Sequence, residues 1–130
     1  MAIVYKSEKD VKKRIKKLLD DYGWFWWMPP ANGYGKVGIS DLNAIKNGVF
    51  MAVEAKFGSN KPTPMQKAFL ESVNAESGFG FVVNDTNIDQ FEAFLVQFGQ
   101  QTELVAKERK MSNEGGAALI DAIRALQALI

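Results

Sequence analysis

Apolar positions recur near the start of this chain at the spacing of an amphipathic helix. Ser7 precedes the pattern as a cap and Gly23 follows it, so the sequence predicts a helix over residues 8–21. The apolar face of this helix is formed by Val11, Ile15, Leu18 and Leu19. The remaining positions are rich in lysine, which is typical of a helix that packs on a core by one side.

Two strand patterns follow and are joined by a hairpin turn. The stretches "ISDLNAI" and "VFMAVEAKF" flank Lys46-Asn47-Gly48, and Asn-Gly is the favoured two-residue turn between antiparallel strands. A third stretch, "GFGFVVN", predicts a short buried strand.

Two more helices are predicted between and after these strands. Thr63 provides a cap, Pro64 occupies the first helical position and Gln66 completes a capping box. Thr86 caps the second helix, which we expect to end near Gly99. The apolar positions are Phe69, Leu70 and Val73 in the first helix and Phe91, Phe94, Leu95 and Phe98 in the second.

An aromatic run, Trp24-Phe25-Trp26-Trp27, lies between the first helix and Pro29-Pro30. Three interpretations compete: a membrane segment, a strand buried on both faces, and a platform for stacking bases. No stretch approaches the roughly 18 apolar residues of a membrane helix and no signal peptide is visible, so we expect no membrane partner and a cytoplasmic protein. The alternation predicts the first strand of the sheet, mainly core, with one face open to a partner subunit or to unpaired bases.

The element order is helix, three strands, helix, strand and helix, which predicts an α/β domain with a mixed sheet flanked by helices over residues 1–98. Residues 99–130 form a predicted C-terminal helical extension. Its last helix, 117–130, has one narrow polar stripe and is otherwise almost entirely apolar. Because such a surface must be covered, the extension packs on its own domain or meets a second copy.

Composition excludes several classes of enzyme. The 130 residues include no cysteine and no histidine. A Ser-His-Asp triad, a Cys-His pair and zinc sites built on Cys or His are therefore excluded. Catalysis must rely on carboxylates, lysines, hydroxyls and amides, or on a hard cation held by oxygen ligands.

Charge is unevenly distributed although the formal net charge is only +1. The first 20 residues hold seven Lys or Arg against three Asp or Glu. This basic end predicts local contact with a polyanion, or else a solvated helix face. The candidate nucleic-acid-binding residues are Lys12, Lys13, Lys16 and Lys17 in the first helix and Tyr34 and Lys36 in the glycine-rich loop before Asp41, where an ordinary surface loop is the alternative.

The predicted hairpin carries the candidate chemistry. Asp41 begins one strand, and Glu54 and Lys56 lie two residues apart in the other, so their side chains point to the same face. Two carboxylates brought together across a hairpin repel each other unless a positive charge lies between them, and a divalent cation is the usual solution. A lysine beside them holds a phosphate or lowers the pKa of an attacking water. A surface ion pair would explain Glu54 and Lys56 if they stood alone.

The order of these motifs resembles a known family. The stretches "GISD", "VEAK" and "TPMQ" are similar to the PD-(D/E)xK nuclease pattern, and within it to the VRR-NUC group, virus-type replication and repair nucleases that are similar to Holliday junction resolvases. The resemblance covers about residues 7–98 and implies a restriction-endonuclease-like fold. One departure is Ser40, where the superfamily motif has proline, and this position is not chemical.

By this resemblance, the ligands of Mg²⁺ or Mn²⁺ are Asp41, Glu54 and the Ala55 carbonyl, and Lys56 is the catalytic lysine. Gln66 corresponds to a glutamine that supports the site, although it is also explained as a capping residue. Glu8 corresponds to a glutamate that many members place near the metal, and the helix dipole explains it equally well.

The resemblance implies a metal-dependent endonuclease that hydrolyses phosphodiester bonds in DNA. It further implies selectivity for branched or flapped DNA and a role in phage replication, recombination or repair. Because resolvase-like relatives act as dimers, it also favours a homodimer, with the apolar tail and the aromatic run contributing to the interface. Two alternatives belong to other classes: a nucleic-acid-binding module that has the fold but does not cleave, and an assembly subunit recruited through its apolar tail. The complete set of Asp41, Glu54 and Lys56 favours the enzyme.

Overall fold

The computed structural model describes residues 3–30, 40–111 and 123–128. The chain divides into two compact units, Met1–Gln97 and Phe98–Ile130. The elements, in order, are α1 (Glu8–Asp21), β1 (Phe25–Trp27), β2 (Leu42–Lys46), β3 (Val49–Ala55), α2 (Pro64–Ala75), β4 (Phe79–Val83) and α3 (Ile88–Met111), of which α3 begins in the first unit and ends in the second.

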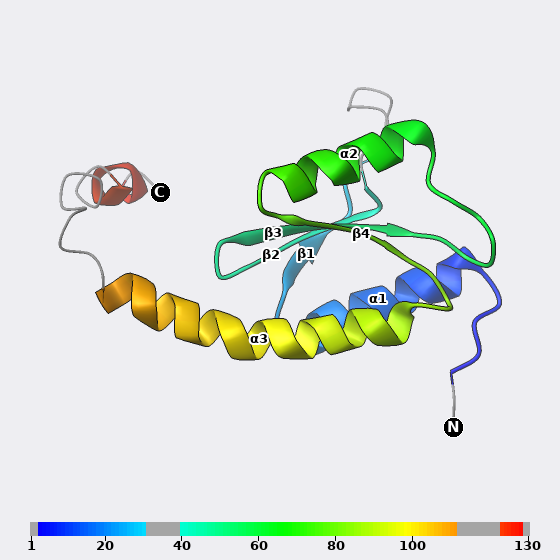
Figure 1. Ribbon diagram of the computed structural model, residues 1–130, viewed down its shortest axis with the longest axis horizontal. Coiled ribbons are helices and arrows are strands. Elements are labelled where there is room, and N and C mark those ends of the chain that lie inside the picture. Colours follow the sequence, from blue (N-terminus) through cyan, green and yellow to red (C-terminus); the bar gives the residue numbers. More distant parts are fainter. Residues whose placement is uncertain (1–2, 31–39, 112–122, 129–130) are drawn as a thin grey trace. The chain divides into compact units, whose positions relative to one another are not determined.

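The four strands form one sheet in the order β1-β2-β3-β4. β1, β2 and β3 are antiparallel neighbours, and β4 is parallel to β3 because α2 carries the chain back across the sheet. Figure 1 shows α2 on one face of the sheet and α1 with the beginning of α3 on the other. The predicted α/β class, with a mixed sheet flanked by helices, is confirmed.

The turn between β2 and β3 is the predicted Asn-Gly hairpin. Asn47 and Gly48 both have positive φ angles, 51° and 80°, and Lys46 pairs with Val49 across them. Positive φ at both central residues is the geometry of a type I′ turn, whose twist matches that of the strands. The turn thereby sets the register of the two strands as far as their other end, where the candidate site lies.

α1 covers one face of the sheet, as its pattern predicts. It spans the expected residues, Ser7 caps it by accepting a hydrogen bond from the Asp10 N–H, and the four residues of its apolar face are fully buried. The sheet residues that share the core with this helix alternate along β2 and β3: Leu42, Ala44, Met51, Val53 and Ala55.

The aromatic run forms the predicted strand with one open face, but it is less buried than the mainly core run that was expected. Trp24 is buried, but 71% of Phe25 and 39% of Trp27 are exposed. β1 is the edge strand of the sheet and packs against α1 on one face. Phe25 and Trp27 alternate with Trp26 and therefore point to the opposite face.

α2 lies close to the sheet because Gly80 has no side chain. A Cβ at this position would overlap the Leu70 carbonyl oxygen of α2. The Asn74 side chain of α2 accepts a hydrogen bond from the Gly80 N–H at 2.7 Å and donates one to its carbonyl at 3.2 Å. These contacts hold α2 over β3 and β4 and so place its first turn, which carries Gln66.

β4 and α3 differ in detail from the prediction. The strand is present, but of its residues only Val83 is fully buried, because β4 is the other edge of the sheet. Thr86 does not cap α3, which begins at Ile88 after a turn in which the Asn84 side chain accepts from the Thr86 and Asn87 N–H groups. The helix also continues through Gly99, since one helical glycine lowers stability by only about 1 kcal/mol.

The apolar tail lies largely outside the described residues. Residues 123–127 are helical, and in this segment 43% of Ile123 and 68% of Leu126 are exposed. Among the helices of the described residues, none is both long enough and apolar enough to cross a membrane.

Candidate active site

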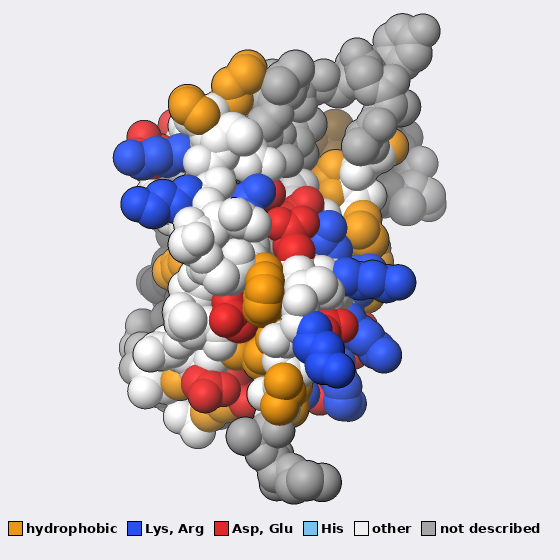
Figure 2. All heavy atoms as spheres, turned by 90° about the vertical axis from the view of Figure 1, so that its right-hand side faces the viewer, with side chains coloured by type: hydrophobic (Ala, Val, Ile, Leu, Met, Phe, Trp, Pro, Cys, Tyr) orange, Lys and Arg blue, Asp and Glu red, His pale blue; other side chains and the backbone are white. Residues whose placement is uncertain are grey.

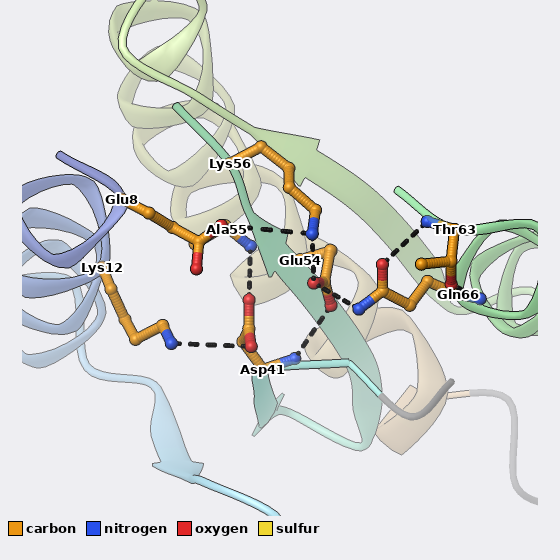
Figure 3. Close-up of polar contacts among 8 residues, drawn as sticks. All are labelled: Glu8, Lys12, Asp41, Glu54, Ala55, Lys56, Thr63 and Gln66. Atoms are coloured by element: carbon orange, nitrogen blue, oxygen red, sulfur yellow. Dashed lines mark hydrogen bonds and ion pairs between the residues drawn. The ribbon is translucent and has the colours of Figure 1, made fainter. Parts of the chain in front are cut away.

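Asp41 and Glu54 lie side by side at the open end of the β2–β3 hairpin. The register pairs Leu42 with Val53, so the next residue of each strand is Asp41 on one side and Glu54 on the other. The Asp41 N–H donates to Glu54 Oε2 at 3.2 Å, and the Ala55 N–H donates to Asp41 Oδ2 at 2.9 Å (Figure 3). Each carboxylate is therefore held by the backbone of the opposite strand.

Lys56 reaches the same point from the residue that follows β3. Its Nζ lies 3.4 Å from Glu54 Oε1, and only 15% of its side chain is exposed. Its backbone N–H donates to the Val83 carbonyl at 3.0 Å, which continues the parallel pairing with β4. The alternation of the strand thus extends to Lys56 and puts its ammonium on the side of Glu54.

Gln66 both caps α2 and contacts the candidate site. Its Oε1 accepts from the Thr63 N–H at 2.9 Å, and its backbone N–H donates to Thr63 Oγ1 at 3.2 Å, which completes the capping box. Its Nε2 donates to Glu54 Oε1 at 2.8 Å. The Gln66 side chain therefore takes part in the capping box through Oε1 and contacts Glu54 through Nε2.

Two residues of α1 complete the cluster. Lys12 Nζ lies 3.5 Å from Asp41 Oδ1, so this lysine pairs with a site carboxylate instead of lying with the outer lysines of the helix. Glu8 Oε1 lies 4.0 Å from Lys56 Nζ. The cluster thus holds three acidic and two basic side chains, in which Glu54 and Asp41 are adjacent and each has a lysine beside it, with Glu8 next to Lys56 and Lys12 next to Asp41.

Glu54 is the carboxyl group of this cluster whose pKa is raised most clearly. Burial raises the pKa of its carboxyl from 4.5 to about 7, and the negative charge of Asp41 beside it adds to the rise, against the opposing effect of Lys56. Its three hydrogen-bond and ion-pair partners are insufficient to offset the loss of water around the carboxylate. A further positive charge at this point would relieve the repulsion between the two carboxylates.

The raised pKa predicts an unusual pH dependence for the cation-free protein. The folded state binds the Glu54 proton more tightly than the unfolded state, so this group's contribution to stability is present below pH 4.5 and is lost as the pH rises through 7. In a chelating buffer, the unfolding free energy of the wild type relative to Glu54→Gln should fall by about 2 kcal/mol between pH 5 and pH 8. Urea unfolding at the two pH values measures this difference, and parallel pH profiles for the two proteins would refute the assignment.

The donor set suits a hard divalent cation. Carboxylate and carbonyl oxygens are the ligands that Mg²⁺ and Mn²⁺ prefer. Asp41 and Glu54 place two carboxylates side by side, and Ala55 follows Glu54 as the last residue of β3. The described residues include no group of three or more His, Cys, Asp or Glu side chains able to hold a metal. Glu8, a predicted ligand, lies against Lys56 and not beside the other two carboxylates. The carboxylates that lie together are therefore Asp41 and Glu54.

The remaining predicted nucleic-acid contacts are dispersed. Lys16 Nζ lies 6.0 Å from the centre of the Trp26 ring, Lys17 pairs with Asp21 at 3.3 Å, and Lys13 is exposed. Figure 2 shows the face where α1 and α2 begin, with Lys and Arg side chains on both sides of acidic ones. Tyr34 and Lys36 lie outside the described residues.

Sequence reasoning missed two features of the site. Asn43 is buried, accepts a hydrogen bond from Ser40 Oγ and lies on the same strand face as Asp41, two residues away. A polar residue at this spacing within an apolar strand was the available signal. The pairing of Lys12 with Asp41 had no local signal, because the two residues are brought together only by the packing of α1 on the sheet.

Comparisons with known proteins do not assign the chain to a family. No protein-family model matches it, and no curated protein does either.

Proposed function

We propose that this chain is a metal-dependent endonuclease that hydrolyses phosphodiester bonds in DNA, with a PD-(D/E)xK site of the VRR-NUC type on a restriction-endonuclease-like sheet. The observation that carries the proposal is the convergence of four residues from three separate segments. Asp41 and Glu54 face each other across the hairpin, and Lys56 and Gln66 both contact Glu54 Oε1, at 3.4 and 2.8 Å. A surface ion pair does not account for a buried carboxylate with a second carboxylate beside it.

Each residue has a role that follows from its contacts. Asp41, Glu54 and the Ala55 carbonyl would hold Mg²⁺ or Mn²⁺, which when bound supplies positive charge that stabilises the transition state of phosphoryl transfer. Lys56 holds a phosphate oxygen or orients the attacking water, because its ammonium lies beside Glu54 with little exposure. Gln66 is a positioning residue, since its amide fixes the orientation of the Glu54 carboxylate.

Lys12 and Lys56 also explain how the two carboxylates coexist without a cation. Each ammonium pairs with one of them, at 3.5 and 3.4 Å. A divalent cation would compete with these ammonium groups for the carboxylates. Released from Asp41, Lys12 would be available to a backbone phosphate of the substrate, so the observed pair with Asp41 is compatible with the predicted phosphate contact.

A cleavage assay over DNA structures tests the proposal. Labelled branched, flapped, single-stranded and linear DNA are incubated with the protein in Mg²⁺, in Mn²⁺ and in chelator. We expect cation-dependent cleavage, with branched or flapped DNA preferred. Cation-independent binding to DNA without cleavage of any structure would instead indicate the non-cleaving binding module.

The basic face of α1 predicts a salt-dependent contribution to DNA binding. Each phosphate contact that is lost reduces the slope of log affinity against log salt by about 0.9 on duplex DNA. We expect Lys13→Gln, Lys16→Gln and Lys17→Gln each to weaken binding and to make the slope shallower by up to that amount. Lys67→Gln, an exposed lysine of α2 that pairs with Glu71, is the matched control. If the slopes of log affinity against log salt equal that of the control, the α1 lysines do not contact phosphates and form a solvated face.

We further propose that the protein is a homodimer in which the apolar tail takes part. The exposure of Ile123 and Leu126 within the described residues supports this proposal. Because α3 is continuous to Met111, the informative truncation ends there and not within the helix. Sedimentation should give a dimer for the intact chain and a monomer for the chain ending at Met111. A monomeric intact chain at micromolar concentration would disprove the dimer.

A further inference from the structure

The exposed aromatic side chains of β1 lie on the same sheet face as the candidate site. The register pairs Trp27 with Asn43, and Phe25 with Ile45, in β2. Paired residues project to the same face, and residues two apart along a strand also do so. Asp41, Asn43 and Ile45 therefore form one row along β2, with Trp27 and Phe25 in the next row.

These side chains form a small apolar surface, here called the β1 aromatic face and defined by Phe25, Trp27, Ile45 and Phe50. Between 39% and 71% of Phe25, Trp27 and Ile45 is exposed, and Phe50 is half-buried. The ring centres of Phe25 and Trp27 are 5.9 Å apart, and those of Trp27 and Phe50 are 6.3 Å apart. α2 packs on β4 and β3, the other half of the same sheet face.

The size of the β1 aromatic face favours a small occupant. Its exposed side chains present apolar surface on the order of 400 Å², given about 150–250 Å² for a whole aromatic side chain. A stable protein interface buries about 800 Å² on each partner. One or two nucleobases, which stack on aromatic side chains irrespective of sequence, match the smaller area.

We propose that the β1 aromatic face stacks unpaired bases of the strand whose scissile phosphate lies beside the cation that Asp41 and Glu54 would hold. Asn43 lies about 7 Å along β2 from Asp41, and Trp27 is one strand, about 5 Å, further across. A base next to the bound phosphate can reach Trp27 at this separation only if it is not stacked within a duplex. The inference rests on the proposed nuclease function and adds a binding site for the unpaired nucleotides that flapped DNA carries beside the scissile bond.

The test measures binding without cleavage. Fluorescence anisotropy in chelator compares a labelled single-stranded oligonucleotide of about 12 nucleotides with a blunt duplex of the same length. Phe25→Ala and Trp27→Leu should each weaken single-strand binding roughly tenfold and change duplex binding by less than about twofold. Trp27→Phe, which keeps an aromatic ring, should retain most of the affinity.

Val96→Ala, at an exposed apolar residue of α3, is the control, and thermal unfolding verifies that each variant is folded. Unchanged single-strand affinity in Phe25→Ala and Trp27→Leu would overturn the proposal, as would failure of the wild type to bind unpaired DNA. Conversion of a dimer into a monomer by these variants, with single-strand affinity unchanged, would assign the face to a second copy and also overturn it. Ring-dependent binding by a protein that never cleaves in Mg²⁺ would support the stacking face and refute the nuclease.

Discussion

Glu54→Gln and Asp41→Ala are each expected to abolish cation-dependent DNA cleavage while leaving the fold intact. Each change removes one of the two carboxylates that would hold the cation, whose charge stabilisation is worth several kcal/mol in the transition state. The expected loss of turnover is therefore roughly 10³-fold or more. The fold should persist because removing a carboxylate from this pair also removes its repulsion with the other.

Single-turnover cleavage measures the loss, and circular dichroism with thermal unfolding verifies the fold. Lys67→Gln is the matched control, because it changes one exposed charge on α2 without touching the site, and it should cleave like the wild type. Wild-type cleavage rates in Asp41→Ala would show that Asp41 has no part in the mechanism. The pair of carboxylates across the hairpin would then not be the cation site.

Lys56→Met is expected to reduce turnover more than cation affinity, by about 10²-fold or more. The ammonium of Lys56 contacts Glu54 but provides no oxygen ligand, so its loss leaves the donors of the cation in place. Because Lys56 lowers the pKa of Glu54, its removal should also shift the pH at which the cation begins to bind to higher values.

Calorimetric titration of Mn²⁺ and cleavage rates at saturating cation separate the two effects for Lys56→Met. Retained cation binding with slow cleavage is the expected pair of results. Abolished cation binding combined with normal cleavage at high cation concentration would show that the lysine organises the ligands and has no part in the chemistry.

The parts of the site that the sequence predicts correctly are those set by local signals. Asn47-Gly48 determines the hairpin register, so Asp41 and Glu54 are adjacent once the turn is recognised. The capping box at Thr63 predicts the beginning of α2 and, with it, the first turn that contains Gln66. Each depends on residues within a few positions of one another.

The features that were not predicted depend on which elements cover which surface. The aromatic run predicts a strand with one open face, but that Phe25 and Trp27 form this face follows from the packing of α1 on the other side of β1, which no local pattern encodes. A strand that is aromatic at every position is compatible with burial of both faces or of only one. Likewise, Lys12 meets Asp41 only because α1 packs across the sheet, while the neighbouring Lys13 remains exposed.

The most direct test of phosphodiester hydrolysis at this site is cleavage of flapped DNA by the wild type with Mg²⁺ in ¹⁸O-labelled water, followed by mass spectrometry of the new ends. Hydrolysis joins one water oxygen to phosphorus as the P–O bond to the leaving oxygen breaks. We therefore expect one ¹⁸O atom in each new terminal phosphate, and intact DNA with Glu54→Gln. Intact DNA with the wild type, or the same labelled ends with Glu54→Gln, would contradict this expectation.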